Sequence, residues 1–280
     1  MHAVALPPLL KAEAQYTLTT ADFERIRKLI HTRAGISLNA GKQAMVYSRL
    51  SRRLRETRQI SFSAYLRWLE QSAGNPEWQE FVNCLTTNLT AFFREEHHFS
   101  ALAEDLRARA ASPVRIWCSA ASTGEEPYSL AMTASETLGP AARVEIVCSD
   151  IDTNVLATAA RGVYAADARG LSPERLKRHF LRGTAANSGF IRVKPELTRL
   201  VEFQPFNLTS ASWSALGSTF DLVFCRNVMI YFDNPTQRRV LEHMHAALRP
   251  GGLLYVGHSE NFSEARDLFR LRGKTIYERV

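Results

Sequence analysis

The sequence is poor in cysteine, and its cysteines are not spaced for metal binding or for a disulfide framework. The 280 residues contain four cysteines. They are Cys84, Cys118, Cys148 and Cys225, and no two of them form a CxxC pair. We expect three of them in predicted strands, where a free thiol behaves as a small apolar residue. This usage excludes a disulfide-stapled secreted domain and favours the reducing cytoplasm.

Long apolar runs and helical pairs of histidines are lacking too. No apolar run approaches the roughly 20 residues that span a membrane. The start, MHAVALPPLLK, has two prolines and no basic region, so we expect no signal peptide. His97 and His98 are adjacent, and His243 and His245 at i, i+2 point to different faces of a helix. We therefore expect no metal centre.

Positive charge is present in excess. The formal net charge is +7, which points to an acidic partner such as nucleic acid, a membrane surface or an acidic protein. Much of the excess falls in residues 42–58, where Glu56 is the one acidic residue. The cations there are Lys42, Arg49, Arg52, Arg53, Arg55 and Arg58. A docking surface is one interpretation of this run, and a solvated helix face is the other.

The order of predicted elements divides the chain into a helical part and an α/β part. Helical periodicity covers residues 17–95, with a first helix capped by Thr20 or Asp22 and a second over residues 40–58. From Phe99 onward strands alternate with helices. Strands are expected at residues 113–118, 143–149, 199–204, 220–225 and 252–258, with a final pair near 275–280. This alternation predicts a mostly parallel sheet with helices on both faces, interrupted at 161–198 by a small inserted subdomain.

One strand–loop–helix unit indicates a cofactor site. Residues 114–118 have the pattern of a buried strand, residues 119–124 form a loop of small residues, and Glu125 opens a helix. Small residues let a ligand approach the backbone, and a helix N-terminus offers unpaired N–H groups. The loop is not the GxGxxG of dinucleotide enzymes, since Gly124 is its only glycine. An ordinary tight turn between strand and helix is therefore the alternative.

Polar side chains follow three further strands, at the edge where open α/β sheets bind ligands. Asp150 suits a ribose diol, because a carboxylate accepts hydrogen bonds from both hydroxyls. The alternative for Asp150, and the favoured role for Asp152, is a helix cap. Asn207 suits the edge of an adenine or, equally, a turn. Arg226 and Asn227 end a continuous apolar strand, where two polar groups gain nothing from burial, so we favour a function for them.

Longer motifs turn these separate signals into a resemblance. The loop at 119–124, Asp150 and the turn LRPGG at 248–252 together resemble the class I methyltransferases that use S-adenosylmethionine (SAM). Four segments narrow the resemblance to the chemotaxis receptor methyltransferases, the CheR family. They are TTNLTAFFRE at 86–95, SAASTGEEPYS at 119–129, SDID at 149–152 and FCRNVMIYFD at 224–233. The resemblance implies a helical domain over 1–85, a linker over 86–98 that contributes to the active site, and a Rossmann-like catalytic domain over 99–280.

The resemblance implies roles for the residues at matching positions. Those implied in SAM binding are Asn88, Thr90, Arg94, Glu125, Asp150, Asn207, Leu208, Arg226 and Asn227. The first three close over SAM and the active site, Glu125 contacts SAM from the loop, and Asp150 holds the ribose. Arg94 and Tyr231 are implied at the reacting centre, although a buried aromatic is the alternative for Tyr231.

The resemblance also implies the reaction and the partners. A receptor glutamate becomes a methyl ester, and S-adenosylhomocysteine is the second product. The basic helix would steer docking onto the acidic cytoplasmic domain of a methyl-accepting chemoreceptor, through Arg49, Arg52, Arg53 and Arg55. The insertion resembles the β-subdomain that in some members binds a peptide at the receptor's carboxyl terminus, and residues 182–193 keep the longer loop of those members. We expect a monomer that does not insert into the membrane.

Two other functions compete with this interpretation. A nucleic-acid methyltransferase would account for the positive charge, but enzymes that methylate amino groups of bases usually carry an Asn/Asp-Pro-Pro-aromatic loop after the fourth strand. This chain has Arg226-Asn227-Val228-Met229 at that point, so we expect no nucleic-acid partner. A non-catalytic adaptor would keep the cofactor fold and only bind receptors. The complete set of implied cofactor residues, together with Arg94, disfavours it.

Overall fold

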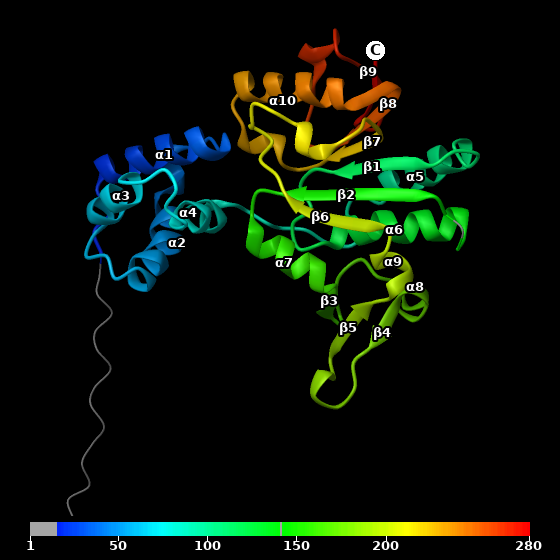
Figure 1. The fold of residues 1–280 in the computed structure, drawn as a ribbon, viewed down its shortest axis with the longest axis horizontal. Coiled ribbons are helices and arrows are strands. Elements are labelled where there is room, and N and C mark those ends of the chain that lie inside the picture. The colour runs from blue at the N-terminus through cyan, green and yellow to red at the C-terminus, as the bar shows by residue number, and fades with distance from the viewer. Residues whose placement is uncertain (1–15, 141) are drawn as a thin grey trace, which may run out of the picture.

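The computed structural model describes residues 16–140 and 142–280, which form a helical domain joined to a larger α/β domain (Figure 1). The expectations for the start of the chain, MHAVALPPLLK, lie outside these residues. Within the described residues, no helix combines the length and the apolar character that crossing a membrane requires.

Four helices pack around a core of their own in the helical domain. They are α1 Thr20–Ala34, α2 Gln43–Glu56, α3 Phe62–Glu70 and α4 Glu77–Leu85, with a short 3-10 helix at Ala40–Lys42 before α2. Val46, Leu50 and Leu54 of α2 are fully buried, as their i, i+4, i+8 spacing predicts for one helix face. Burial of each such side chain contributes about 2 kcal/mol relative to exposure.

The first helix is capped by Thr19, so the expected caps Thr20 and Asp22 are wrong. The Thr19 hydroxyl accepts the Asp22 N–H at 3.1 Å, and Asp22 Oδ2 accepts the Thr19 N–H at 3.4 Å. Asp22 is thus the third helical residue of a reciprocal capping box. Glutamate or glutamine is the usual residue at this position.

A seven-stranded sheet forms the centre of the α/β domain, in the order β6-β2-β1-β7-β8-β10-β9. The strands are β1 Val114–Cys118, β2 Val144–Asp150, β6 Val201–Pro205, β7 Phe220–Cys225, β8 Leu248–Val256, β9 Phe269–Gly273 and β10 Ile276–Arg279. In this order, β6, β2, β1, β7 and β8 pair in parallel. Strand β10 pairs antiparallel with both β8 and β9. The expected mostly parallel sheet is confirmed. Strand β8 starts earlier than predicted, because Leu248 already pairs with Phe220.

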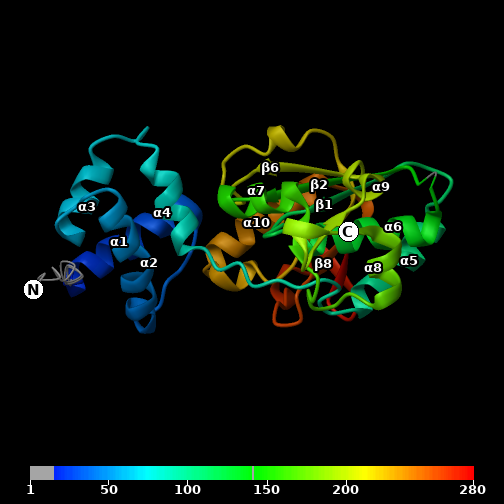
Figure 2. The ribbon, with the colours of Figure 1, turned by 90° about the horizontal axis from the view of Figure 1, so that it is seen from below.

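Helices cover both faces of this sheet (Figures 1 and 2). They are α5 His97–Ala108, α6 Glu125–Leu138, α7 Thr153–Arg161 and α10 Asn234–Ala247. Successive strand residues point to opposite faces, so Cys118 and Cys148 join the core under α5 and α6. Cys225 joins the core under α10. All three thiols are free and buried in strands, as expected.

The residues between α7 and β6 form a small antiparallel sheet that packs on the main core. Its strands are β3 Val163–Ala165, β4 Phe180–Arg182 and β5 Phe190–Val193, in the order β3-β5-β4. Helix α8 Pro173–His179 precedes β4, and α9 Pro195–Thr198 leads into β6. Tyr164, Phe180 and Ile191 belong to the same hydrophobic cluster as α5 and α6. The inserted subdomain therefore shares a core with the sheet.

The helical domain meets the α/β domain at two places. Ile36, just after α1, forms an antiparallel bridge with Phe232, and the Ser37 N–H donates to the Tyr231 carbonyl at 2.7 Å. From α4, Asn83 Nδ2 donates to the Thr153 hydroxyl at 3.0 Å. These contacts hold the helical domain over the carboxyl edge of the parallel strands.

Candidate active site

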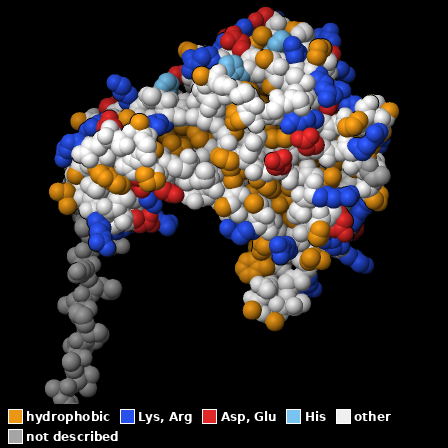
Figure 3. Space-filling model, in the orientation of Figure 1, with side chains coloured by type: hydrophobic (Ala, Val, Ile, Leu, Met, Phe, Trp, Pro, Cys, Tyr) orange, Lys and Arg blue, Asp and Glu red, His pale blue; other side chains and the backbone are white. Residues whose placement is uncertain are grey.

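A cavity lies between the helical domain and the carboxyl edge of the parallel sheet. The helical domain gives it an apolar wall of Ala34, Ile36, Leu38, Met45 and Leu85. The α/β domain contributes Ser119, Ala120, Ser122, Glu126, Asp150, Arg226 and Asn227. The segment between α4 and α5 adds Asn88, Leu89, Thr90 and Arg94. Figure 3 shows hydrophobic side chains in the hollow between the two domains.

Asp150 ends β2 in the cavity wall. Its Oδ2 accepts the Ser122 N–H at 2.8 Å, and its Oδ1 accepts the Asp152 N–H at 3.0 Å. Burial raises the pKa of this carboxyl to about 6, and the two N–H bonds limit the rise. The carboxylate thus lies directly beside the small-residue loop, where the sequence predicts a ribose site.

Asp152 caps α7, as the sequence favoured. Its Oδ1 accepts the N–H groups of Asn154 at 2.9 Å and Val155 at 3.3 Å. Its Oδ2 accepts the Thr86 hydroxyl at 2.7 Å and Asn88 Nδ2 at 2.8 Å. The predicted site residue Asn88 therefore lies in the cavity wall with its amide bound to the cap of α7, which fixes the start of the segment between α4 and α5.

Arg226 is buried between two carboxylates. Its Nη1 lies 2.6 Å from Glu126 Oε2, and its Nη2 lies 3.3 Å from Glu95 Oε2. Burial raises the pKa of Glu126 although Arg226 opposes the rise. Burial also disfavours ionised Glu95, but the hydrogen bond from His258 and the charge of Arg226 lower its pKa to about 2. With both carboxylates ionised, the group carries net negative charge, which favours a cationic ligand.

The glutamate that reaches the cavity is not the one that the resemblance implies. Glu126 lines the cavity, whereas Glu125 is absent from the lining among the residues that the structure describes. Glu125 Oε2 instead accepts the Thr123 hydroxyl at 2.6 Å. Neighbouring positions of a helix point about 100° apart, so Glu125 and Glu126 leave the first turn of α6 in different directions. The pair Glu-Glu gives no sequence signal that separates them.

Glu260 is a site residue that the sequence analysis missed. Its buried carboxylate accepts the N–H groups of Asn227 at 2.9 Å, Val228 at 3.0 Å and Met229 at 2.8 Å. A fourth N–H comes from Gly257 at 2.6 Å. Four backbone donors on one carboxylate fix the turn that carries Asn227 into the cavity wall. The available signal was a glutamate shortly after the apolar run at residues 253–256.

Arg94 and Tyr231, implied at the reacting centre, both line the cavity, as does Thr90. Arg94 is half-buried, and its Nη1 donates to the Leu89 carbonyl at 3.0 Å. Tyr231 is half-buried as well, so the alternative of a fully buried aromatic does not hold. The structure brings together two residues that lie on different segments of the chain.

Asn207 and Leu208 lie in the cavity wall with different roles. Asn207 Nδ2 donates to the Arg33 carbonyl at 2.7 Å, and its Oδ1 accepts the N–H and hydroxyl of Thr209. This is the turn role, extended to a bond between domains. The amide of Asn207 is therefore engaged inside the protein, while the buried Leu208 supplies apolar surface.

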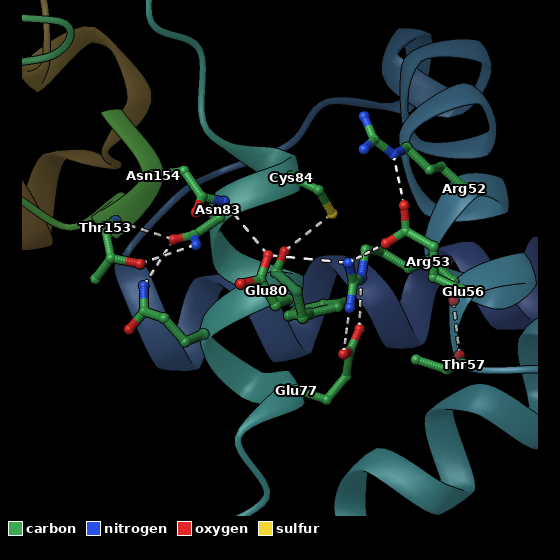
Figure 4. A network of polar contacts seen from close by, with 12 residues as sticks. Arg52, Arg53, Glu56, Thr57, Glu77, Glu80, Asn83, Cys84, Thr153 and Asn154 are labelled. Carbon is green, nitrogen blue, oxygen red and sulfur yellow. Dashed lines mark hydrogen bonds and ion pairs between the residues drawn. The ribbon is translucent and has the colours of Figure 1, made fainter. Parts of the chain in front are cut away.

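The basic helix α2 is only partly available for docking (Figure 4). Arg53 Nε and Nη2 bond both oxygens of Glu77 at 2.8 and 2.6 Å, and the Arg53 side chain is 16% exposed. Arg49 Nη1 donates to a backbone carbonyl just after α4. Arg52 and Arg55 are exposed. The buried carboxylate of Glu77 requires a counter-charge, which accounts for the position of Arg53.

In the folded protein, His97 and His98 lie near a third residue of a type that binds metals, Glu95. Their ligand atoms and those of Glu95 lie within 4.8 Å of one another. The guanidinium of Arg226, 3.3 Å from Glu95, already supplies positive charge there and opposes a metal cation. Burial lowers the pKa of His98 to about 4, so this ring is neutral at physiological pH. The geometry favours an arginine counter-ion for Glu95.

Some of the non-glycine residues with positive φ angles lie in or beside this cavity. Ser122 and Asn227 line it with φ angles of 48° and 58°, and Phe93 and Glu95 flank Arg94 with φ angles of 52° and 59°. Such a conformation costs on the order of 1–2 kcal/mol per residue. Residues of this kind gather at functional sites, where the surrounding structure holds them.

The fold and the cavity define the class of protein. A parallel sheet with an antiparallel pair at one edge, a small-residue loop after β1 and a carboxylate after β2 are the features of class I SAM-dependent methyltransferases. The side chains fit SAM chemically. Asp150 suits the ribose, the apolar side chains of Phe206 and Leu208 suit the adenine, and Glu126 suits the positive sulfonium.

Comparison with known proteins identifies the family. Residues 88–277 match CheR methyltransferase, SAM binding domain, and residues 21–86 match CheR methyltransferase, all-alpha domain. The chain is 53% identical to the chemotaxis protein methyltransferase of Klebsiella aerogenes, over 93% of this chain and 90% of that protein. It is 53% identical to chemotaxis protein methyltransferase 2 of Pseudomonas aeruginosa, over 94% of each. It is 49% identical to the chemotaxis protein methyltransferase of Escherichia coli, over 96% of this chain and 94% of that protein. The chain belongs to the CheR methyltransferase family, and SAM is its cofactor.

Proposed function

We propose that this protein transfers a methyl group from SAM to glutamate side chains of bacterial chemoreceptors, forming methyl esters. The observation that carries the proposal is one cavity in which Arg94 and Tyr231 meet the predicted SAM-binding groups of Asp150 and Arg226. Identities of about half to relatives named chemotaxis protein methyltransferase, over nearly the whole chain, support the receptor as substrate. The absence of an Asn/Asp-Pro-Pro loop after β7 disfavours a nucleic acid.

The reaction needs positioning more than proton transfer. A glutamate has an ordinary pKa near 4.3, so the nucleophile is already ionised at neutral pH and needs no general base. SAM supplies an electrophilic methyl group on a positively charged sulfur. Correct alignment of the reacting atoms can contribute about 7–11 kcal/mol. Arg94 orients the substrate carboxylate through its planar fork, and Tyr231 shapes the pocket beside it.

The remaining cavity residues hold SAM in this proposal. Asp150 accepts the ribose hydroxyls, and Leu208 borders the adenine. Arg226 and Asn227 line the opposite side, where Glu260 fixes their turn. Glu126 faces the positive sulfonium in place of Glu125, whose carboxylate accepts the Thr123 hydroxyl. Asn88 and Thr90 close over SAM, as the resemblance implies.

Partners and domain division complete the proposal. Arg52 and Arg55 steer docking onto the acidic cytoplasmic helices of a receptor, with Arg49 and Arg53 behind them. A receptor tail peptide adds to the outer strand β4 of the inserted sheet, which pairs on one side with β5. The chain divides into residues 1–85, the linker 86–98 and residues 99–280, with 161–198 inserted. The protein acts as a cytoplasmic monomer, and its free buried thiols suit that compartment.

Replacing Arg94 by alanine tests the proposal. We expect methyl transfer to receptor membranes, measured with tritiated SAM, to fall by about 100-fold, since misplacement of a reacting group costs on that order. Arg107→Ala, at an exposed arginine of α5 outside the cavity lining, is the matched control and should transfer normally. Transfer by Arg94→Ala at the wild-type rate would contradict the assignment.

A further inference from the structure

The segment that carries Arg94 is packed against the inserted subdomain. This segment runs from α4 along the α/β domain (Figure 2). The Phe92 ring lies 4.9 Å from that of Tyr164 and 5.8 Å from that of Phe180, both edge to face. The guanidinium of Arg175 lies 3.6 Å from the centre of the Phe93 ring. Two consecutive residues just before Arg94 are therefore held by side chains of residues 161–198.

Gly170 brings the two backbones into closest approach. A Cβ at this position would lie 1.9 Å from the Phe92 carbonyl oxygen and 2.7 Å from its carbonyl carbon. Real Cβ atoms do not approach backbone so closely, so any side chain at position 170 displaces Phe92 or the subdomain. The φ of Gly170 is +91°, a second reason for glycine. Phe92 is two residues from Arg94, so this displacement reaches the active site.

Arg175 joins the same contact to the catalytic helix α6. Its Nε and Nη2 bond the carboxylate of Glu136 on α6 at 3.1 and 3.0 Å. His179 Nε2 lies 2.9 Å from Glu136 Oε1, the oxygen that Arg175 Nε also bonds. Burial opposes its ionisation, but these partners lower the pKa of Glu136 to about 2. The subdomain is thereby fixed to α6 and to Phe93 at once.

A second contact reaches the cofactor loop. The Tyr164 hydroxyl donates to the Thr123 carbonyl at 2.9 Å. A Cβ on Gly124 would lie 2.5 Å from that hydroxyl oxygen, so the only glycine of the loop makes room for it. The inserted subdomain therefore contacts both the segment with Arg94 and the loop beside Asp150.

We propose that the inserted subdomain 161–198 is a positioning element of the methyl-transfer site, acting on Arg94 through Gly170 and Arg175 and on the cofactor loop through Tyr164. This role is separate from any binding of a receptor peptide at its outer strand. It rests on the proposed function of Arg94. None of the three residues lines the cavity among the described residues, so each acts through another residue.

Gly170→Ala is the decisive substitution, and Gly273→Ala is its control. Gly273 ends β9, outside the inserted subdomain and the cavity lining, with a φ of +132°, and nothing lies within 4 Å of a Cβ built there. Both variants place alanine at a positive φ, and only Gly170→Ala meets Phe92. We expect kcat for receptor methylation at saturating SAM to fall at least tenfold in Gly170→Ala and less than twofold in Gly273→Ala. The melting temperatures of both variants are measured in parallel with kcat.

Equal kcat values for the two glycine variants would overturn the proposal. Arg94→Ala, assayed in parallel, separates this failure from failure of the proposed function. Wild-type transfer by Arg94→Ala contradicts the role of Arg94 itself. Loss of transfer in Arg94→Ala together with full transfer in Gly170→Ala contradicts only the positioning role.

Tyr164→Phe tests the contact with the loop without changing packing. It removes one hydroxyl and keeps the ring against Phe92. We expect its SAM dissociation constant, measured by calorimetry, to rise about threefold to tenfold, as loss of one hydrogen bond implies, with kcat at saturating SAM nearly unchanged. An unchanged dissociation constant would remove the loop from the proposal, since a purely structural tyrosine would alter only the melting temperature.

Discussion

At the scale of single residues, the cavity sets its carboxyl groups to different pKa values. Asp150 accepts two backbone N–H groups but is buried, and its pKa rises to about 6. Glu95 is partly buried, yet His258 and Arg226 lower its pKa to about 2. The group proposed to bind ribose therefore titrates near neutral pH, whereas the group that holds Arg226 stays ionised.

SAM affinity should depend on the titration of Asp150. The ionised carboxylate accepts both ribose hydroxyls, so below pH 6 binding must release the proton that the free protein holds. We expect the dissociation constant to rise about tenfold per pH unit below 6 and to be flat between pH 6 and 7. Calorimetric titration from pH 4.5 to 7 measures this. Asp150→Asn should bind weakly at every pH, and an unchanged profile in that variant would assign the dependence to another group.

The adjacent glutamates Glu125 and Glu126 allow a matched pair of substitutions. Glu126→Gln removes one of the two charges that hold Arg226 and lowers the negative charge facing the sulfonium. We expect SAM affinity to fall about tenfold or more, because a hydrogen bond to a charged group contributes roughly 1.5–3 kcal/mol. Glu125→Gln keeps the bond to Thr123 and should change affinity less than threefold. The reverse order of the two variants in calorimetry would contradict the geometry.

At the scale of elements, helix α2 carries arginines in two different environments. Arg53 faces inward to Glu77, while Arg52 and Arg55 face solvent. Arg53→Ala leaves the buried carboxylate of Glu77 without its counter-charge, although the Tyr65 hydroxyl still donates to it at 2.9 Å. We expect it to lower the free energy of unfolding of the helical domain by about 3 kcal/mol, as for other broken buried pairs. Arg52→Ala should cost less than about 0.5 kcal/mol. Urea denaturation of the two variants makes the comparison.

The strands and helices were predictable because their patterns are local. The apolar runs of β1, β2 and β7 and the spacing on α2 depend on neighbouring residues. Glu260 was not predictable, because its four donors come from two turns that only the folded sheet brings together. The alternation of strands and helices likewise predicted a mostly parallel sheet, but it did not predict the order of the strands in that sheet.

The expected site residues agree with the geometry of the cavity where they lie at the end of a strand and differ from it where the rotation of a helix decides. Asp150 is the last residue of β2, so its place at the sheet edge needed no tertiary information. The choice between Glu125 and Glu126 depends on the rotation of α6, and the choice between Arg52 and Arg53 depends on where Glu77 lies. Neither the rotation of α6 nor the position of Glu77 can be read from two adjacent residues of the same type.

At the scale of the whole molecule, the net charge of +7 becomes relevant to receptor encounter. Attraction to acidic helices raises the association rate and is weakened by salt. We expect the double reversal Arg52→Glu with Arg55→Glu to lower receptor methylation at low salt at least tenfold, with SAM affinity unchanged. Arg107→Glu with Arg266→Glu, on exposed positions of the α/β domain outside the inserted subdomain and the cavity lining, changes the net charge equally and controls for it.

Equal loss in both double variants would assign the effect to overall charge. Loss of SAM affinity in Arg52→Glu with Arg55→Glu would indicate misfolding of the helical domain. The docking proposal is supported only if receptor methylation falls, SAM affinity is kept and added salt narrows the difference from the unmodified protein.

The position of the cavity between two separately packed cores has a thermal consequence. The helical domain has its own hydrophobic cluster, and the α/β domain has two others. A ligand that contacts both domains binds only when both are folded and docked, so at 100 times its dissociation constant it adds about 2.7 kcal/mol to that state alone. We therefore expect SAM, bound as proposed, to couple the melting of the two domains, so that the saturated enzyme unfolds as one cooperative unit.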